Sequence, residues 1–152
     1  MVIGFRIFPE GFAYVVLDGT QSAPAVVAKG RLSLPKNHSW PACLSWVRKQ
    51  LGEVLLTHDF EGACIKTIEP MAKRKSVERL QIEAVIKEYL HSAKALDCNT
   101  RIKSQLKRDI KDFTDAARYI ERVLTETDTL SELNTPQYQE ATLAAVSELP
   151  ED

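Results

Sequence analysis

The fold class is decided by the stretch GACIKTIEPMAKRKSVERLQIEAVIKEYL, residues 62–90. It begins with a short apolar run at 62–68 that is bounded by loops, as expected of a buried strand. A basic loop follows, and a long amphipathic helix starts near Ser76, although Arg79 does not complete a capping box with it. The apolar side of this helix consists of Ile82, Val85, Ile86 and Tyr89. The stretch therefore predicts a strand, a loop and a long helix.

The region before this stretch predicts an antiparallel meander and a helix. Apolar strands are expected at residues 2–8, 12–18 and 25–34. The turn PEG joins the first two, and the polar connection GTQSAP leads to the third. Ser39 is placed to cap a helix that has Pro41 in its first turn. One broad apolar stripe then continues along this helix to Leu55.

The region after the stretch predicts a weaker strand and further helices. The strand candidate is AKALDCN, residues 93–99. Helical spacing of apolar residues recurs at residues 102–110, 113–124 and 135–149. Asp112 with Asp115 resembles an N-terminal cap, and Pro136 suits the first position of the last helix.

Three strands, a helix, a strand, a helix, a strand and further helices are the sequence outline of a ribonuclease-H-like α/β domain. The expected architecture is a mixed five-stranded sheet with helices on both faces and right-handed crossovers. The chain has 152 residues, of which 44% are hydrophobic and 27% are charged. This length and composition suit a single domain at 1–152.

Composition argues against several classes of protein. No apolar run approaches the roughly 20 residues that span a bilayer, and the first residues do not read as a signal peptide. Cys43, Cys64 and Cys98 are far apart, so neither a zinc site nor a disulfide framework is expected. The sequence contains no P-loop, G-x-S-x-G or G-x-G-x-x-G motif. We therefore expect a cytoplasmic protein without a membrane partner.

The formal net charge of −1 conceals a basic middle and an acidic end. Residues 101–111 carry five basic side chains against Asp109, and residues 121–152 carry eight acids against Arg122. Candidate phosphate contacts are Lys73, Arg74, Lys75 and Arg79 after the central strand, and Lys103, Lys107 and Lys111 at i,i+4 spacing. Exposed lysines are also common on solvated helices, and few aromatic residues that could stack on bases lie nearby.

Four segments resemble RuvC-type Holliday-junction resolvases, which have the ribonuclease-H-like fold. VIGFRIFPEGFAYVVLD resembles their opening strands, and residues 62–90 resemble their strand, flexible loop and long helix. NTRIKSQLKRDIKDFTDAARYIERVL is similar to their basic connection and the helix after it, and TPQYQEATLAAV to their last catalytic helix. Within this superfamily the chain looks most similar to a small group of uncharacterised bacterial proteins, through Ile-Lys in the central strand and LQIEA at 80–84.

The resemblance implies a degenerate active site. Resolvase-type nucleases use clustered carboxylates to hold two divalent ions roughly 4 Å apart. The first acid aligns with Arg6 and the second with Lys66, whereas the last helix offers Gln137 and Glu140. A cation in a ligand position repels a metal ion strongly in a partly buried site. With these replacements we expect no catalytic residues, no metal and no cofactor.

Two further expectations concern the remaining acids. Glu83 falls early in the long helix, and a salt bridge from it to Lys66 or Arg6 would replace the metal structurally. Alternatively, the active site is displaced, and the chain keeps a relocated magnesium or manganese site. Its ligands would then come from Asp18, Glu69, Glu83 and Glu140.

Three functions follow from these alternatives. The first is a catalytically inactive resolvase-like domain that binds DNA or RNA, or supports a nucleic-acid-processing assembly, through Arg6, Lys66 and the basic side chains above. The second is a protein-interaction module, whose acidic end and helical faces dock a partner subunit or a second copy of the chain. The third is a nuclease with the relocated metal site.

Overall fold

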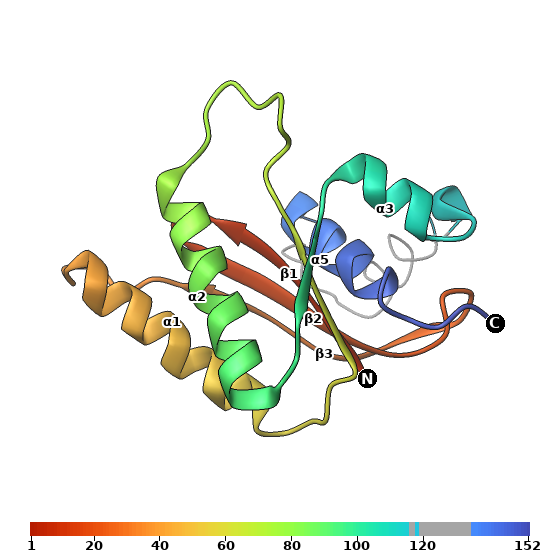
Figure 1. Ribbon diagram of the computed structural model, residues 1–152, viewed down its shortest axis with the longest axis horizontal. Helices are drawn as coiled ribbons and strands as arrows, with labels where there is room; N and C mark the ends of the chain where they lie inside the picture. Colours follow the sequence, from red (N-terminus) through yellow and green to blue (C-terminus); the bar gives the residue numbers. More distant parts are fainter. Residues whose placement is uncertain (116–117, 119–134) are drawn as a thin grey trace.

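The computed structural model describes residues 1–115, 118 and 135–152 (Figure 1). Within them lies a five-stranded sheet in the order β3-β2-β1-β4-β5. Its strands are β1 (Val2–Phe8), β2 (Gly11–Gly19), β3 (Pro24–Ser33), β4 (Gly62–Lys66) and β5 (Cys98–Arg101). The first three form an antiparallel meander, whereas β4 pairs in parallel with both β1 and β5. The predicted mixed five-stranded sheet is therefore confirmed.

Four helices have their bounds within the described residues. They are α1 (Trp40–Leu55), α2 (Val77–Lys94), α3 (Lys103–Asp109) and α5 (Pro136–Val146). α1 and α2 cover one face of the sheet and α5 covers the other (Figure 1). The hydroxyl of Ser39 accepts a hydrogen bond from the amide of Ala42, and that of Ser76 accepts one from the amide of Arg79. Ser76 therefore caps α2 without a capping box.

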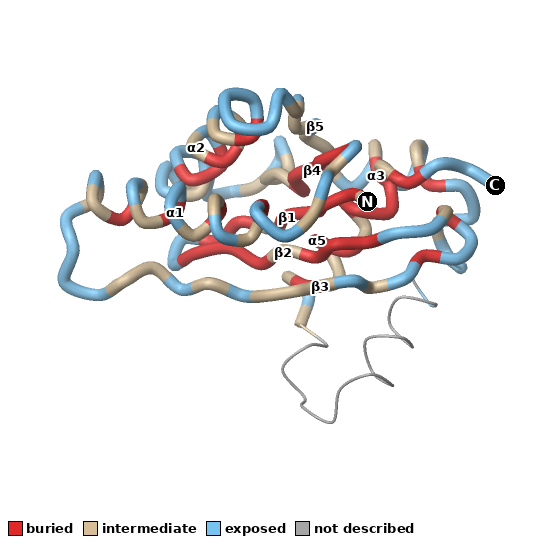
Figure 2. The backbone as a smooth tube through the Cα atoms, turned by 90° about the horizontal axis from the view of Figure 1, so that it is seen from below, coloured by how far each residue is buried: buried red, intermediate tan, exposed pale blue. Residues whose placement is uncertain are grey.

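Alternate residues of β1 divide the core into two layers, because successive side chains of a strand point to opposite faces. Ile3, Phe5 and Ile7 pack with α1 and α2, and each is buried almost completely. Val2 and Phe8 pack on the other side with α5. Figure 2 shows β1 buried along nearly its whole length, whereas β3 at the sheet edge is mostly half-buried or exposed.

Gly4 allows α5 to lie directly on β1. A Cβ atom at this position would lie 2.0 Å from the carbonyl oxygen of Ala141 and 2.4 Å from the backbone nitrogen of Ala145. No side chain fits into such a space, so the helix and the strand touch through their backbones. Glu140, which precedes Ala141, is thereby brought over the C-terminal half of β1.

The last strand begins later than the sequence predicted. α2 continues to Lys94 and ends at Ala95, which has a left-handed backbone conformation with a φ of 49°. Glycine is the usual residue at such a helix end, so an alanine carries no signal that the helix stops there. The strand predicted at 93–99 therefore had the wrong bounds, since β5 comprises Cys98–Arg101.

Other predicted ends differ by smaller amounts. β4 stops at Lys66 rather than at residue 68. α3 stops at Asp109, so Lys111 lies beyond the helix and the predicted face of three lysines is reduced to two. The predicted helix at 113–124 lies mostly outside the described residues. In the part of the chain that is described, no helix is long and apolar enough to cross a membrane.

Candidate functional site

Three cations stand side by side near the C-terminal ends of β1, β4 and β5. Arg6 is the register partner of Lys66, and Lys66 is the register partner of Arg101. Register partners on parallel strands point to the same face of the sheet. This face is the one under α5, because Arg6 contacts Glu140 of that helix. We call Arg6, Lys66 and Arg101 the cationic row.

Arg6 is neutralised by α5. Its Nε–H donates to a carboxylate oxygen of Glu140, and its Nη1 donates to the carbonyl oxygen of Ile7. The Arg6 side chain is 19% exposed and that of Glu140 is 33% exposed, so solvent reaches the pair. The close packing at Gly4 delivers Glu140 to this place. Of the degenerate positions predicted from the sequence, Arg6, Lys66 and Glu140 therefore lie together.

Lys66 is neutralised by the loop that follows its own strand. Its Nζ lies 2.8 Å from Oε1 of Glu69 and donates to the carbonyl oxygen of Thr67. The side chain of Lys66 is 6% exposed, whereas that of Glu69 is 43% exposed. Glu69 also accepts a hydrogen bond from the backbone N–H of Lys103. The hydrogen bond from Lys66 contributes most to holding the pKa of Glu69 below its usual value.

The predicted salt bridge from Glu83 to Lys66 or Arg6 is wrong. The carboxylate of Glu83 accepts a hydrogen bond from the hydroxyl of Thr67 and lies 3.3 Å from Nζ of Lys87. Lys87 is one turn later on α2, where an i,i+4 partner is always within reach. Lys66 pairs instead with Glu69, in the loop after its own strand, and Arg6 pairs with Glu140 of α5.

Arg79 was predicted to be a surface contact, but the structure shows it half-buried in the first turn of α2. Its Nε atom is buried and has no hydrogen-bond partner among the described residues. Burial and then the charge of Arg6 lower the pKa of Arg79 to about 10, while Glu140 and Glu83 partly oppose this shift. Leaving a buried donor unpaired costs roughly 1–3 kcal/mol.

Gln137 is the fourth degenerate position, and it also carries an unsatisfied group. It lies one turn before Glu140 on α5, so the two side chains share one side of the helix. Its Oε1 atom is buried and finds no hydrogen-bond partner in the described part of the chain. Two unsatisfied polar atoms thus belong to residues that surround the Arg6–Glu140 pair.

Arg101 was counted among the basic residues of the sequence but was not predicted to be a site residue. Its Nε lies 2.8 Å from Oδ2 of Asp109, and its Nη1 donates to Glu148 and to the hydroxyl of Ser147. Hydrogen bonds from Arg108 and Arg101 lower the pKa of Asp109 to about 2. The pairing register of β4 and β5 could have identified Arg101, because a strand that ends at this residue places it beside Lys66.

The predicted phosphate contacts surround the cationic row on two elements. Lys73, Arg74 and Lys75 are exposed in the loop between β4 and α2, and Lys103 and Lys107 are exposed on α3. The loop rises beyond the end of β4, whereas α3 follows β5 and runs back toward the C-terminus (Figure 1). The hydrogen bond from the backbone of Lys103 to Glu69 ties the start of α3 to the loop. Lys103 is thereby brought beside the loop that carries Lys73, Arg74 and Lys75.

The four acids proposed for a relocated metal site do not converge. Asp18 follows Leu17, whose register partner is Val2, so it lies at the opposite end of β1 from Arg6. Glu69, Glu83 and Glu140 are each paired with a different cation. Within the described residues, no three histidine, cysteine, aspartate or glutamate side chains are grouped so as to hold a metal ion.

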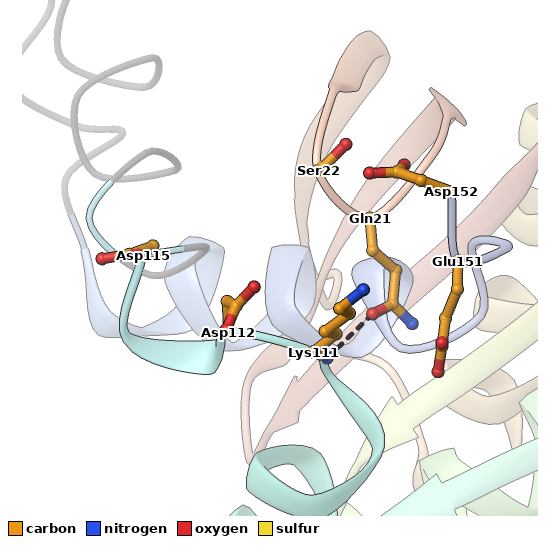
Figure 3. Close-up of a pocket in the computed structure, with 7 residues that line it drawn as sticks. All are labelled: Gln21, Ser22, Lys111, Asp112, Asp115, Glu151 and Asp152. Atoms are coloured by element: carbon orange, nitrogen blue, oxygen red, sulfur yellow. Dashed lines mark hydrogen bonds between the residues drawn. The ribbon is translucent and has the colours of Figure 1, made fainter.

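A pocket of about 300 Å³ lies beyond Asp109, the ion-pair partner of Arg101, and its lining is mainly acidic and polar. Figure 3 shows its lining: Gln21, Ser22, Lys111, Asp112, Asp115, Glu151 and Asp152. The amide of Gln21 accepts a hydrogen bond from the backbone of Lys111 and donates to the carbonyl oxygens of Asp109 and Leu149. Four carboxylates against one lysine line this pocket, so its charge does not favour a phosphate.

Comparisons with known proteins identify the fold. No protein-family model matches the sequence, and no curated protein matches it. Among solved structures, Thermus thermophilus RuvC in complex with a Holliday junction substrate is similar, with a TM-score of 0.74 and 9% identity. That match covers 96% of this chain and 90% of the RuvC chain.

A second group of similar structures comes from a virus. The fowlpox virus resolvase in complex with its substrate Holliday junction DNA has a TM-score of 0.53 and 12% identity. The match covers 98% of each chain. The chain therefore has the ribonuclease-H-like fold of RuvC-type resolvases, as the sequence predicted, with very low sequence identity to these structures.

Proposed function

We propose that this protein binds nucleic acid through the end of the sheet that carries the cationic row, without a divalent metal and without cutting the strand. The observation that supports this most is the register of Arg6 and Lys66. They are neighbours at the two strand positions where the resemblance to resolvases implies metal ligands. Cations therefore stand at both of these positions.

Electrostatics opposes a metal ion at this place. A divalent ion about 4 Å from one uncompensated ammonium is repelled by roughly 8 kcal/mol at an effective dielectric constant of about 20. Glu140 and Glu69 reduce this repulsion by pairing with Arg6 and Lys66, but the pairing occupies the two carboxylates that could otherwise serve as metal ligands. A nuclease of this fold needs metal ions to activate water and to stabilise the leaving oxygen. We therefore infer a catalytically inactive domain.

The exposed cations supply the affinity. Lys73, Arg74 and Lys75 are exposed in the loop between β4 and α2, and Lys103 and Lys107 are exposed on α3, whose first residue is hydrogen-bonded to Glu69 of that loop. Contacts from such side chains to phosphates position a nucleic acid but do not read its sequence. Similar structures hold Holliday junctions. A four-way DNA junction is therefore the first ligand to test, beside a duplex and a single strand.

Fluorescence anisotropy at several salt concentrations tests this proposal. Three to five phosphate contacts give a slope of about −0.9 per contact in a plot of log affinity against log salt, so affinity falls roughly tens- to hundreds-fold between about 50 and 200 mM. Replacing Lys103 and Lys107 by Gln should reduce the slope by about two. The matched control replaces Arg48 and Lys49, two exposed cations of α1, and should leave the slope unchanged.

Absence of binding to all three ligands at low salt would overturn the proposal and favour the protein-interaction alternative. One observation supports that alternative: Met71, Val77 and Leu80 are large apolar side chains that are exposed around the start of α2. A partner subunit or a second copy of the chain would cover them. Light scattering of the purified protein over a range of concentrations measures self-association directly.

A further inference from the structure

We infer that Arg31, on the edge strand β3, is a further phosphate contact, so that a bound nucleic acid extends across the end of the sheet from the loop after β4 to β3. This inference rests on the proposed function, because it enlarges the same binding surface. Neither the sequence pattern nor the resemblance to resolvases points to Arg31, since the basic residues that they single out all lie on other elements.

The register of the sheet places Arg31 in line with the cationic row. Arg31 is the register partner of Ala13 on β2, and Ala13 is the register partner of Arg6. Directly opposed residues on antiparallel strands, like register partners on parallel ones, point to the same face of the sheet. Arg31 therefore shares the α5 face with Arg6 and lies two strands farther along the same line.

A contact with Phe8 agrees with this placement and orients the guanidinium. Phe8 packs in the core under α5, and the Cζ atom of Arg31 lies 4.7 Å from the centroid of its ring. The ring is buried, whereas Arg31 itself is exposed, so the guanidinium keeps a side that is open to solvent. A cation that is already held over a ring loses less conformational freedom when it binds a ligand. Arg31 is therefore pre-organised for an anion.

Charge distinguishes Arg31 from the members of the cationic row. Each member of the row pairs with a carboxylate: Arg6 with Glu140, Lys66 with Glu69, and Arg101 with Asp109. Within the described residues, no acid pairs with Arg31. A phosphate that binds here therefore displaces no internal carboxylate. The two groups also match in geometry, because phosphate oxygens accept parallel hydrogen bonds from one guanidinium.

The width of the sheet sets the length of nucleic acid that this surface requires. In the order β3-β2-β1-β4, the strands β3 and β4 are three strand spacings apart. Three spacings amount to about 14 Å, and one strand of B-DNA rises about 3.4 Å per nucleotide. A phosphate on Arg31 and a phosphate at the start of the loop after β4 are therefore about four nucleotides apart. One continuous backbone can reach both.

The test is fluorescence anisotropy with Arg31→Gln on a duplex at several salt concentrations. Loss of one phosphate contact should reduce the slope of log affinity against log salt by about 0.9. It should also weaken binding roughly five- to tenfold at about 100 mM salt, for all sequences alike. Arg31→Lys keeps the charge and should restore the slope. Circular dichroism of each variant checks that it is folded.

Arg48→Gln is the matched control. Arg48 is also exposed, and its Cζ atom lies 5.2 Å from the centroid of the Tyr89 ring. It stands on α1, which covers the other face of the sheet. Arg48→Gln therefore removes the same charge and the same type of ring contact at a different place, and it should leave the slope unchanged.

An unchanged slope in Arg31→Gln, while replacement of Lys103 and Lys107 still reduces it, would overturn the inference and keep the proposed function. An equal loss in Arg48→Gln would overturn it too, because the effect would then follow from net charge and not from position. Arg31→Gln protein that binds normally but self-associates in light scattering would assign this arginine to protection of the sheet edge instead. Wild-type protein that binds no nucleic acid at low salt would overturn both the proposed function and this inference.

Discussion

On β1, Ile3, Phe5 and Ile7 face α1 and α2, whereas Gly4 and Arg6 between them face α5. The first set is apolar and buried almost completely. The second set replaces side-chain packing by a direct backbone contact and an ion pair. One strand therefore serves two different purposes on its two faces.

β4 repeats this division. Ala63 and Ile65 pack in the core with α1 and α2, whereas Cys64 and Lys66 lie on the other face. Burial of apolar side chains is the main source of folding free energy, while ion pairs near the surface contribute little. The difference teaches that apolar packing continues to the ends of β1 and β4 on the α1–α2 face, whereas on the α5 face it gives way to ion pairs at these strand ends.

The largest effect is expected on the apolar face. Phe5 is completely buried, and its ring packs against that of Phe12. Phe5→Ala should lower the free energy of unfolding by about 3–5 kcal/mol, through lost burial and the cavity that remains. Urea denaturation followed by circular dichroism measures this. A loss below about 1 kcal/mol would show that the core does not depend on this face.

A smaller effect is expected from the ion pairs of Arg101. Asp109→Asn should lower the free energy of unfolding by about 1 kcal/mol at neutral pH, because the group is partly exposed and screened. The pKa of Asp109 is depressed from 3.8 to about 2, so its contribution is complete above 3.8 and is lost as the pH falls through about 2. Urea denaturation at a series of pH values should therefore show the two proteins converging in acid.

Asp59→Asn, which changes an exposed acid, is the control for this comparison. A difference between wild type and Asp109→Asn that stays constant down to pH 2 would contradict the assigned ion pairs.

The smallest effect on stability is expected at Lys66. Lys66→Met removes the cost of burying the ammonium, and its partner Glu69, whose side chain is 43% exposed, can be solvated instead of remaining as a buried unpaired charge. Lys66→Met should therefore change the free energy of unfolding by no more than about 1 kcal/mol. The same denaturation series measures it. A loss above about 3 kcal/mol would make this lysine a structural residue and would break the division between the two faces.

The sequence was sufficient to predict the order of strands and helices, because apolar residues repeat every second position in strands and at helical spacing in helices. The resemblance to resolvases, which aligned Arg6 and Lys66 with metal ligands, also implied that the two lie together. Two parallel strands that finish at one end of a sheet bring such residues side by side. The end of α2 at Ala95 was not predictable, because no glycine marks it.

The choice of ion-pair partners could not be predicted either. Glu83 was as reasonable a partner for Lys66 as Glu69 from sequence spacing alone. Which acid pairs with Lys66 depends on where β4 stops and on the path of the loop after it. This loop places Oε1 of Glu69 2.8 Å from Nζ of Lys66. The unpartnered Nε of Arg79 is likewise a feature of the tertiary packing, and no local sequence pattern reports it.

The affinity for a four-way DNA junction in EDTA and in magnesium, at matched ionic strength, tests the central claim most directly. Arg6 and Lys66 stand where metal ligands would be, so we predict that magnesium does not strengthen binding and that the DNA is intact at the end of each titration. Competition of magnesium for the DNA phosphates lowers the affinity instead. Binding that requires magnesium, or a junction that is cut when magnesium is present, would contradict the account.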